Sequence, residues 1–374
     1  MGVCCVSAGP VLVAGLSGQL RVLLDAIRAL SAAYIVLHHL AIRGNPGVIE
    51  PLLRFGQEAL MVFFLLSGFV IHANERHRAT SNLPGYLRRR AIRIYPTLLA
   101  AMGVSMLVAL ADGRLAERFD AAEALCTVFG LADIGYHKPG TICGPFMGNT
   151  PLWSLSYEIV FYAIYPIALA LFLRAGRWSQ HLLGAASAAL VACYIAYPSH
   201  FLLLPAYFLL WWCGAMLAET HLNPRARLSD IGVPLGYLCL GAMLWAGSAV
   251  MQGGETLGTY PALMARHFTF AAGATVLALI GLRRWTGAGA GVPGAAAWAW
   301  LSSISYGVYV MHFPLLIQWS LAETWIGLAL TLCLLIFCAV WLDRKINQRL
   351  RDLLRRTTVR EITIAPDRHY SHQE

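Results

Sequence analysis

The sequence predicts an all-α polytopic membrane protein, a bundle of about ten transmembrane helices. Its composition indicates the class, because 58% of the 374 residues are hydrophobic and only 13% are charged, whereas soluble domains carry about 25% charged residues. The apolar residues also gather in long runs, and a helix of about 20 such residues crosses the hydrocarbon core of a bilayer. These two observations exclude a soluble globular domain.

The apolar runs place each helix in turn. In chain order they cover residues 22–42, 57–74, 94–111, 151–173, 181–198, 200–219, 231–250, 266–282, 298–319 and 324–342. The fifth and sixth runs are split near Tyr197, Pro198 and Ser199. Around them we expect a cytoplasmic lead-in over 1–20, a transmembrane domain over 21–342 and a basic cytoplasmic tail over 343–374.

The distribution of basic residues predicts that both termini are cytoplasmic. With the N-terminus inside, most lysines and arginines fall on the cytoplasmic side, as the positive-inside rule requires. The basic residues then outside are Arg43, Arg54, Arg114, Arg118, Lys138 and Arg266. This asymmetry and attraction to anionic lipid explain the net charge of +9, so no nucleic-acid partner is expected. The tail sequence DRKINQRLRDLLRR suits either an interfacial helix or a solvated charge run.

Arg28 and His39 are ionisable residues within the first apolar run, eleven positions apart. At about 100° and about 1.5 Å per residue, they project from one helix face at depths roughly 16 Å apart. Ionisable groups at such depth are costly and normally face a bundle interior or a wet cavity. The pair therefore predicts a functional site that connects two levels of the membrane.

Two further ionisable residues are expected at the level of His39. Glu158 lies in the run that enters from outside, roughly 10 Å below the outer boundary, and His312 lies at a similar depth. Each alone has a structural explanation, such as a hydrogen bond between helices. Together they favour a catalytic site, in which His39 is the general base and Glu158 orients its imidazole. His38 projects about 100° away from His39 and is the weaker candidate.

The serines and cysteines give no catalytic or metal motif. No G-x-S-x-G elbow is present, so Ser67, Ser154 and Ser156 fit helix packing or hydrogen bonding to substrate better than nucleophilic catalysis. The nine cysteines have no metal-like spacing, and we expect no metal. Cys126 and Cys143, in the long outer loop over 112–150, could form a disulfide if that loop faces an oxidising compartment.

An arginine cluster follows the second run, on the loop and helix start that carry Arg88, Arg89, Arg90 and Arg93. Guanidinium groups suit the phosphates of an activated donor, although positive-inside topology alone would place several arginines there. Arg90 and Arg93 share a helical face in the segment RRRAIRIYP. We therefore expect these two to bind the anionic part of a donor.

Five segments in this order resemble acyltransferase family 3, whose members are membrane-bound O-acyltransferases. The segments are LDAIRALSAAYIVLHHL, FFLLSGFVI, YLRRRAIRIYP, TPLWSLSYEIVFYAIYP and ISYGVYVMHFPLL. The resemblance covers roughly residues 21 to 342 and implies a ten-helix fold that moves an acyl group, often acetyl, from cytoplasmic acyl-CoA to an acceptor hydroxyl. The family's functional positions fall on Arg28, His39, Arg90, Arg93, Glu158 and His312. Many relatives carry a second acid directly after that glutamate, whereas this chain has Ile159.

The sequence thus predicts an integral O-acyltransferase of the cytoplasmic (inner) membrane that modifies a cell-surface or exported glycan or glycolipid. Arg28 would line the donor route, and Arg90 and Arg93 would hold the phosphates of acyl-CoA, a co-substrate rather than a bound cofactor. The remaining expected substrate contacts are Asp25, Ser67, Trp153, Ser156, Tyr306 and His312. A transporter or flippase of such a carbohydrate is the alternative, although no inverted repeat or pair of Gly/Pro-broken helices supports it. A catalytically inactive structural or sensory member is a third reading, disfavoured because Arg28, His39 and Glu158 are all present.

Overall fold

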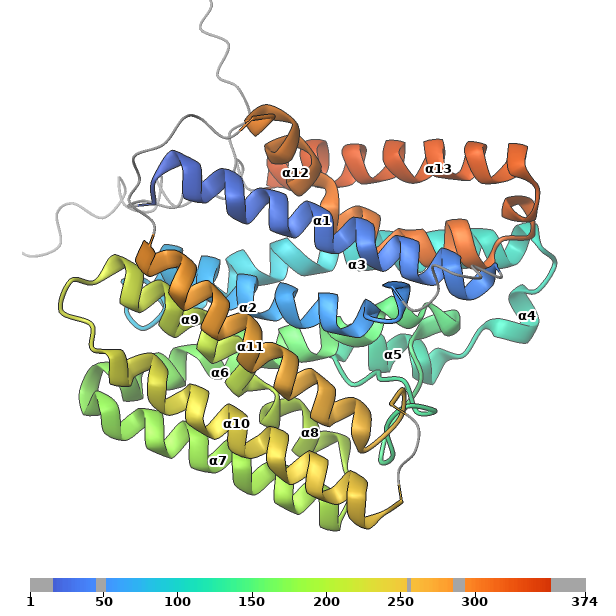
Figure 1. The fold of residues 1–374 in the computed structure, drawn as a ribbon. Coiled ribbons are helices and arrows are strands. Elements are labelled where there is room, and N and C mark those ends of the chain that lie inside the picture. The colour runs from blue at the N-terminus through green and yellow to red at the C-terminus, as the bar shows by residue number, and fades with distance from the viewer. Residues whose placement is uncertain (1–15, 45–51, 254–256, 285–292, 351–374) are drawn as a thin grey trace, which may run out of the picture.

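The computed structural model describes residues 16–44, 52–253, 257–284 and 293–350. Within these ranges the chain is built from helices, and its β structure consists of one isolated bridge between Ala132 and Cys143. The long helices lie side by side and run mostly along one common direction (Figure 1). The predicted all-α class is confirmed.

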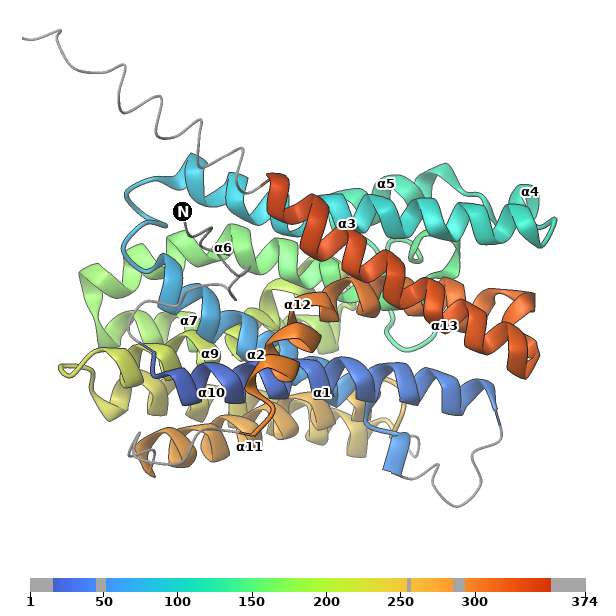
Figure 2. The ribbon, with the colours of Figure 1, turned by 90° about the horizontal axis from the view of Figure 1, so that it is seen from above.

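The described helices follow one another with short connections. The long ones are α1 (Gly18–Arg43), α2 (Gly56–Glu75), α3 (Leu83–Ala111), α6 (Trp153–Ala175), α7 (Arg177–Ala196), α9 (Phe208–Leu222), α10 (Leu228–Met251), α11 (Ala262–Arg284), α12 (Ala295–His312) and α13 (Trp325–Ala339). The shorter ones are α4 (Leu115–Arg118), α5 (Ala121–Phe129) and α8 (His200–Ala206). Both views place α1 beside α2 and α13 beside α12 (Figure 1, Figure 2).

Nine helical segments of the described chain are long and apolar enough to cross a membrane. They match the predicted runs from 57–74 onward, and α8 and α9 together form one of them, His200–Leu222. The helix α1 is not among the nine, although its 26 residues coincide with the first predicted run and it packs along α2 and α12. The multi-pass membrane architecture is therefore confirmed, and the cytoplasmic location of both termini stays a prediction.

The helices α2 and α9 form the tightly packed centre of the bundle. A Cβ atom on Gly68 would lie 2.0 Å from the carbonyl oxygen of Trp211, and one on Gly214 would lie 2.0 Å from that of Leu65. Small residues let two helix backbones approach this closely in a membrane. Because α9 is almost wholly buried, it serves as the core against which the helices of the site are fixed.

Helix α3 begins earlier than predicted and carries the whole arginine cluster. Asn82 caps its first turn by accepting a hydrogen bond from the backbone N–H of Gly85, and Pro84 suits the first helical turn. The sequence divided the cluster between a loop and a helix start, whereas the structure places all of it on the helix. Arg88 to Arg93 are consequently held on a helix, where Arg90 and Arg93 do share a face.

The helical end of the chain extends beyond the predicted domain boundary at residue 342. The segment η6 (Val340–Ile346) continues α13 as a π-helix, and helical structure reaches Leu350. Asp343 is buried there and accepts hydrogen bonds from the Gly307 N–H, at 2.7 Å, and from Thr97 Oγ1, at 3.2 Å. Most of the expected lead-in, residues 1–15, and the end of the tail, residues 351–374, lie outside the described residues.

The long outer loop folds back into the bundle instead of lying over it. We call the end of the bundle that carries residues 112–149 the outer end. The disulfide between Cys126 and Cys143 closes part of this loop, with Cα atoms 6.5 Å apart. Asn149 is buried and donates hydrogen bonds to Val310 O at 3.0 Å and to Ser105 Oγ at 3.4 Å. Because Ser105 lies about 9 Å inside the outer end of α3, α6 starts well below that end.

Candidate active site

A hydrogen-bonded pair of histidines joins the outer halves of α1 and α12. His39 Nδ1 lies 3.0 Å from His312 Nε2, and the two ring centroids are 5.1 Å apart. His312 Nδ1 lies 2.7 Å from the backbone oxygen of Tyr309. The sequence had placed His312 among the substrate contacts, whereas the structure makes it the direct partner of His39.

The direction of these hydrogen bonds assigns the tautomers. A carbonyl only accepts, so His312 donates through Nδ1–H to Tyr309 O and keeps a lone pair on Nε2. His39 must then donate through Nδ1–H to that lone pair, which leaves its own lone pair on Nε2. No other described residue binds His39 Nε2, and the His39 side chain is partly exposed. A neutral imidazole with one oriented, available nitrogen is the arrangement of a general base.

Glu158 lies deeper than predicted and does not pair with His39. Its Oε1 accepts hydrogen bonds from Ser67 Oγ at 3.0 Å and Tyr162 OH at 2.9 Å. The prediction of a common level for His39 and Glu158 assumed that α6 starts at the outer surface. Because the folded-in loop lowers the start of α6, Glu158 is shifted towards the level of Arg28.

Arg28, Arg93 and Glu158 gather around this deeper level. Arg93 and Glu158 are among the charges that act on Arg28, and the Arg93 guanidinium lies 5.0 Å from the ring centroid of Tyr306. Neither Arg28 nor Arg93 forms an ion pair within the described ranges. The structure thus brings together arginines that lie far apart in the sequence, and their role in donor binding stays a prediction.

Arg90 lies beside this group but has an acidic partner. Its guanidinium carbon is 5.8 Å from the ring centroids of both Tyr86 and Tyr162, and its Nη2 donates to Glu75 Oε1 at 3.0 Å. Glu75 also accepts two hydrogen bonds from Arg89, at 2.9 and 2.6 Å. Sequence reasoning missed Glu75 because it ends the preceding helix and no spacing rule connects it to α3.

The other predicted contacts divide into two groups. Ser67 and Tyr306 belong to the deeper level, where Tyr306 OH donates to Ile94 O at 3.2 Å, and Asp25 is a neighbour of Arg28. Trp153 and Ser156 are instead buried in contacts within the chain, because Ser156 Oγ donates to Ala132 O at 2.8 Å. These two side chains anchor the outer loop and are not available to a substrate.

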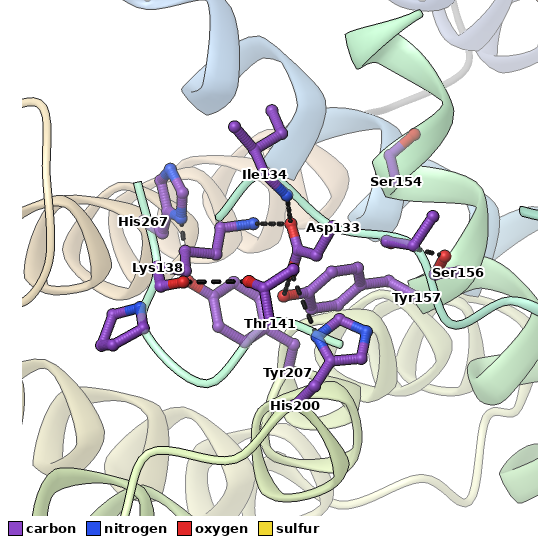
Figure 3. A network of polar contacts seen from close by, with 12 residues as sticks. Asp133, Ile134, Lys138, Thr141, Ser154, Ser156, Tyr157, His200, Tyr207 and His267 are labelled. Carbon is purple, nitrogen blue, oxygen red and sulfur yellow. Dashed lines mark hydrogen bonds and ion pairs between the residues drawn. The ribbon is translucent and has the colours of Figure 1, made fainter. Parts of the chain in front are cut away.

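A fully buried polar network, centred on Asp133, holds the outer loop against α6 and α8 (Figure 3). Lys138 Nζ and Tyr157 OH each lie 2.7 Å from a carboxylate oxygen of Asp133, and His200 Nδ1 lies 3.5 Å away. Lys138 Nζ also lies 3.4 Å from the ring centroid of Trp153. Burial lowers the pKa of Lys138, and the charge of Asp133 opposes that shift. The sequence placed Lys138 in the outer loop, and in the structure only 1% of it is exposed.

Comparison with known proteins identifies the family. The acyltransferase family 3 profile (Acyl_transf_3), described as an acyltransferase domain, matches residues 21–344. Acyltransferase MdmB of Streptomyces mycarofaciens is 33% identical over 114 residues, 30% of this chain and 28% of the relative. Nodulation protein 10 of Rhizobium leguminosarum bv. viciae is 25% identical over 138 residues, 34% of this chain and 36% of the relative.

The matched stretches span about a third of the length of these two relatives. No solved structure matches the chain significantly. The family match nevertheless covers most of the sequence, and it favours an enzyme over the transporter and inactive-member alternatives. The chain belongs to acyltransferase family 3 and is a multi-pass membrane protein.

Proposed function

We propose that this acyltransferase moves an acyl group, typically acetyl, from cytoplasmic acyl-CoA to a hydroxyl of a cell-surface or exported glycan. The observation that carries the proposal is the hydrogen-bonded pair of His39 and His312, which leaves Nε2 of His39 with a lone pair. Such a nitrogen can take the proton of an attacking hydroxyl. His312 takes the orienting role that the sequence had assigned to Glu158.

The transfer step follows from this assignment. The acceptor hydroxyl loses its proton to His39 Nε2 while its oxygen attacks the thioester carbonyl carbon. A C–O bond forms, the C–S bond breaks, and His39 returns the proton to the departing CoA thiolate. His312 Nε2 accepts the Nδ1–H hydrogen bond throughout, which steadies the imidazolium that forms between the two proton transfers.

Arg28 and Arg93 are the proposed donor-binding residues, with Arg90 beside them. The first two form no ion pair among the described residues, although Asp25 and Glu158 act on Arg28 from further away. Their guanidinium groups can therefore form charge-assisted hydrogen bonds to phosphate. Arg90 shares Glu75 with Arg89, and a donor phosphate would compete with that carboxylate. Glu158 accepts hydrogen bonds from Ser67 and Tyr162 and supplies negative charge near Arg28. This charge offsets part of the repulsion between the arginine side chains.

The predicted topology supports a reaction that crosses the bilayer of the inner membrane. The distribution of basic residues supports an arginine level nearer the cytoplasm, where acyl-CoA is made. The disulfide of the outer loop suits an oxidising outer side. The histidine pair then lies towards the acceptor side.

Complementation with a single variant tests the proposed function. Cells lacking the gene receive the wild-type chain or His39→Ala, and the O-acyl groups of their surface glycans are released by mild base and measured. Loss of a general base should lower acylation by about 10²–10⁴-fold. His181→Ala on the exposed face of α7 is the matched control and should acylate normally. Equal acylation by wild type and His39→Ala, at equal amounts of inserted protein, would overturn the mechanism.

A further inference from the structure

A groove of about 660 Å³ lies at the outer end of the bundle, between α10, α11 and the start of α2. Most of its lining is small or apolar, including Ala246, Ala249, Ala265 and Phe270. Ala246 and Phe270 are exposed on the surfaces of α10 and α11, which are membrane-spanning helices. The groove therefore opens sideways, towards the hydrocarbon of the bilayer.

The groove also contains a buried ion pair. Arg266 Nη2 lies 2.6 Å from Glu58 Oε1, and Arg266 Nη1 donates to Leu257 O at 2.7 Å. Glu58 is only 2% exposed, and its second carboxylate oxygen, Oε2, accepts no hydrogen bond from the described residues. An ionisable pair in a membrane segment is costly and usually marks a binding or transport site. An unfilled carboxylate oxygen in this position suits a hydroxyl donor.

The charged end of the groove adjoins the histidine pair. The first turn of α2 packs directly on His38, because a Cβ atom on Gly56 would lie 2.2 Å from the His38 ring. The ring centroids of His38 and His39 are 5.1 Å apart. Glu58 follows Gly56 by two residues, so the polar end of the groove and the contact with His38 lie on two faces of the same turn of α2.

The wall behind Glu58 and Arg266 is fixed by other contacts. Tyr207 OH lies 2.8 Å from His267 Nδ1, next to Arg266 in the chain, and the Tyr260 N–H donates to His137 O at 2.9 Å. The second contact ties the start of α11 to the loop that carries the Asp133 network (Figure 3). A polar site held in this way is organised before its ligand arrives, which lowers the entropic cost of binding.

We propose that this groove binds the acceptor and that the acceptor is a glycolipid. Its hydrocarbon chain would lie along Ala246, Ala249 and Phe270, and a sugar hydroxyl would donate to Glu58 Oε2. The inference rests on the proposed acyl transfer. It specifies the acceptor of that reaction, which would be attached to a lipid and would enter sideways from the membrane. A water-soluble glycan would make no use of an apolar groove that opens to lipid.

Photolabelling of the full chain in lipid nanodiscs tests this site. The two probes are a decyl β-glucoside with a diazirine in its alkyl chain and a methyl ether with the same alkyl diazirine but no hydroxyls. The glucoside should label the segment 246–270 about tenfold more than the ether, as one hydrogen bond to a charged group predicts. Glu58→Gln should abolish most of that preference.

Filling the groove provides a second, independent variant. Ala246→Trp adds an indole at an exposed position of the lining and should reduce labelling of this segment by both probes, whereas Ala186→Trp on the exposed face of α7 should not. Unchanged labelling in Ala246→Trp, or a glucoside that labels no better than the ether, would overturn the inference. A different result would contradict the proposed function itself, namely equal acylation of surface glycans in cells with the wild type and with His39→Ala.

Discussion

The two levels of the site are held in opposite ways. At the outer level, His39 and His312 belong to a chain of neutral hydrogen bonds that ends on a backbone carbonyl, and the neighbouring loop is fixed by a buried Lys138–Asp133 pair. At the deeper level, Arg28 and Arg93 remain without ion pairs among the described residues. The outer level is built to keep one geometry, whereas the deeper level keeps positive charge available for a ligand.

Because of this difference, we expect variants at the two levels to lose different properties of the protein. Variants of the outer level should reduce stability or turnover without weakening the binding of acyl-CoA. Variants of the deeper level should weaken acyl-CoA binding and leave the fold intact.

The largest effect is expected at Lys138. Lys138→Met leaves the charge of Asp133 buried without its partner, which should lower the free energy of unfolding by about 3–5 kcal/mol. Thermal unfolding in nanodiscs, followed by tryptophan fluorescence, measures the loss. Lys345→Met is the matched control because that lysine is exposed. Adding Asp133→Asn to Lys138→Met should restore part of the stability, and a single variant that unfolds like wild type would contradict the account.

A smaller effect is expected at His312. His312→Phe keeps an aromatic ring but removes the acceptor for His39 Nδ1–H, leaving Ile35 O, 3.1 Å away, as its remaining partner. We expect a loss of about 10–100-fold, the range found when the hydrogen-bond partner of a metal-bound histidine is removed. Surface O-acyl content should fall by that factor while labelled acetyl-CoA still binds. A fall in acetyl-CoA binding instead would place His312 in the donor site.

The smallest effect is expected at Arg93. Arg93→Gln should weaken the binding of labelled acetyl-CoA about tenfold, the contribution of one charge-assisted hydrogen bond, without changing the unfolding temperature. Arg283→Gln, on the exposed end of α11, should bind normally. Unchanged affinity in Arg93→Gln would remove this residue from the proposed donor site.

The sequence was sufficient to predict features that depend on a single helix. Apolar runs located the helices, because length and hydropathy govern membrane insertion, and the spacing of Arg28 and His39 along one helix placed them correctly on a shared face. The convergence of Arg28 with Arg93 followed from charge and from the family resemblance. These inferences need only local geometry.

The sequence was insufficient where a loop determines depth. The level of Glu158 depends on Asn149, whose contacts with α3 and α12 lower the start of α6, and no periodicity reveals such an insertion. The burial of Lys138 was missed for the same reason, since its buried partners come from the loop and from α6. Tyr162, four residues after Glu158, and Tyr86, four residues before Arg90, are missed partners that spacing along one helix face could have identified.

The contact between the outer loop and α12 also bears on how the enzyme is made. Asn149 and Val310 are 161 positions apart, and His39 and His312 are 273 apart. A ribosome must therefore synthesise and release α12 into the membrane before either the start of α6 or the histidine pair can reach its final position. The histidine pair therefore forms late in biogenesis, after the helices from α1 to α12 have been inserted.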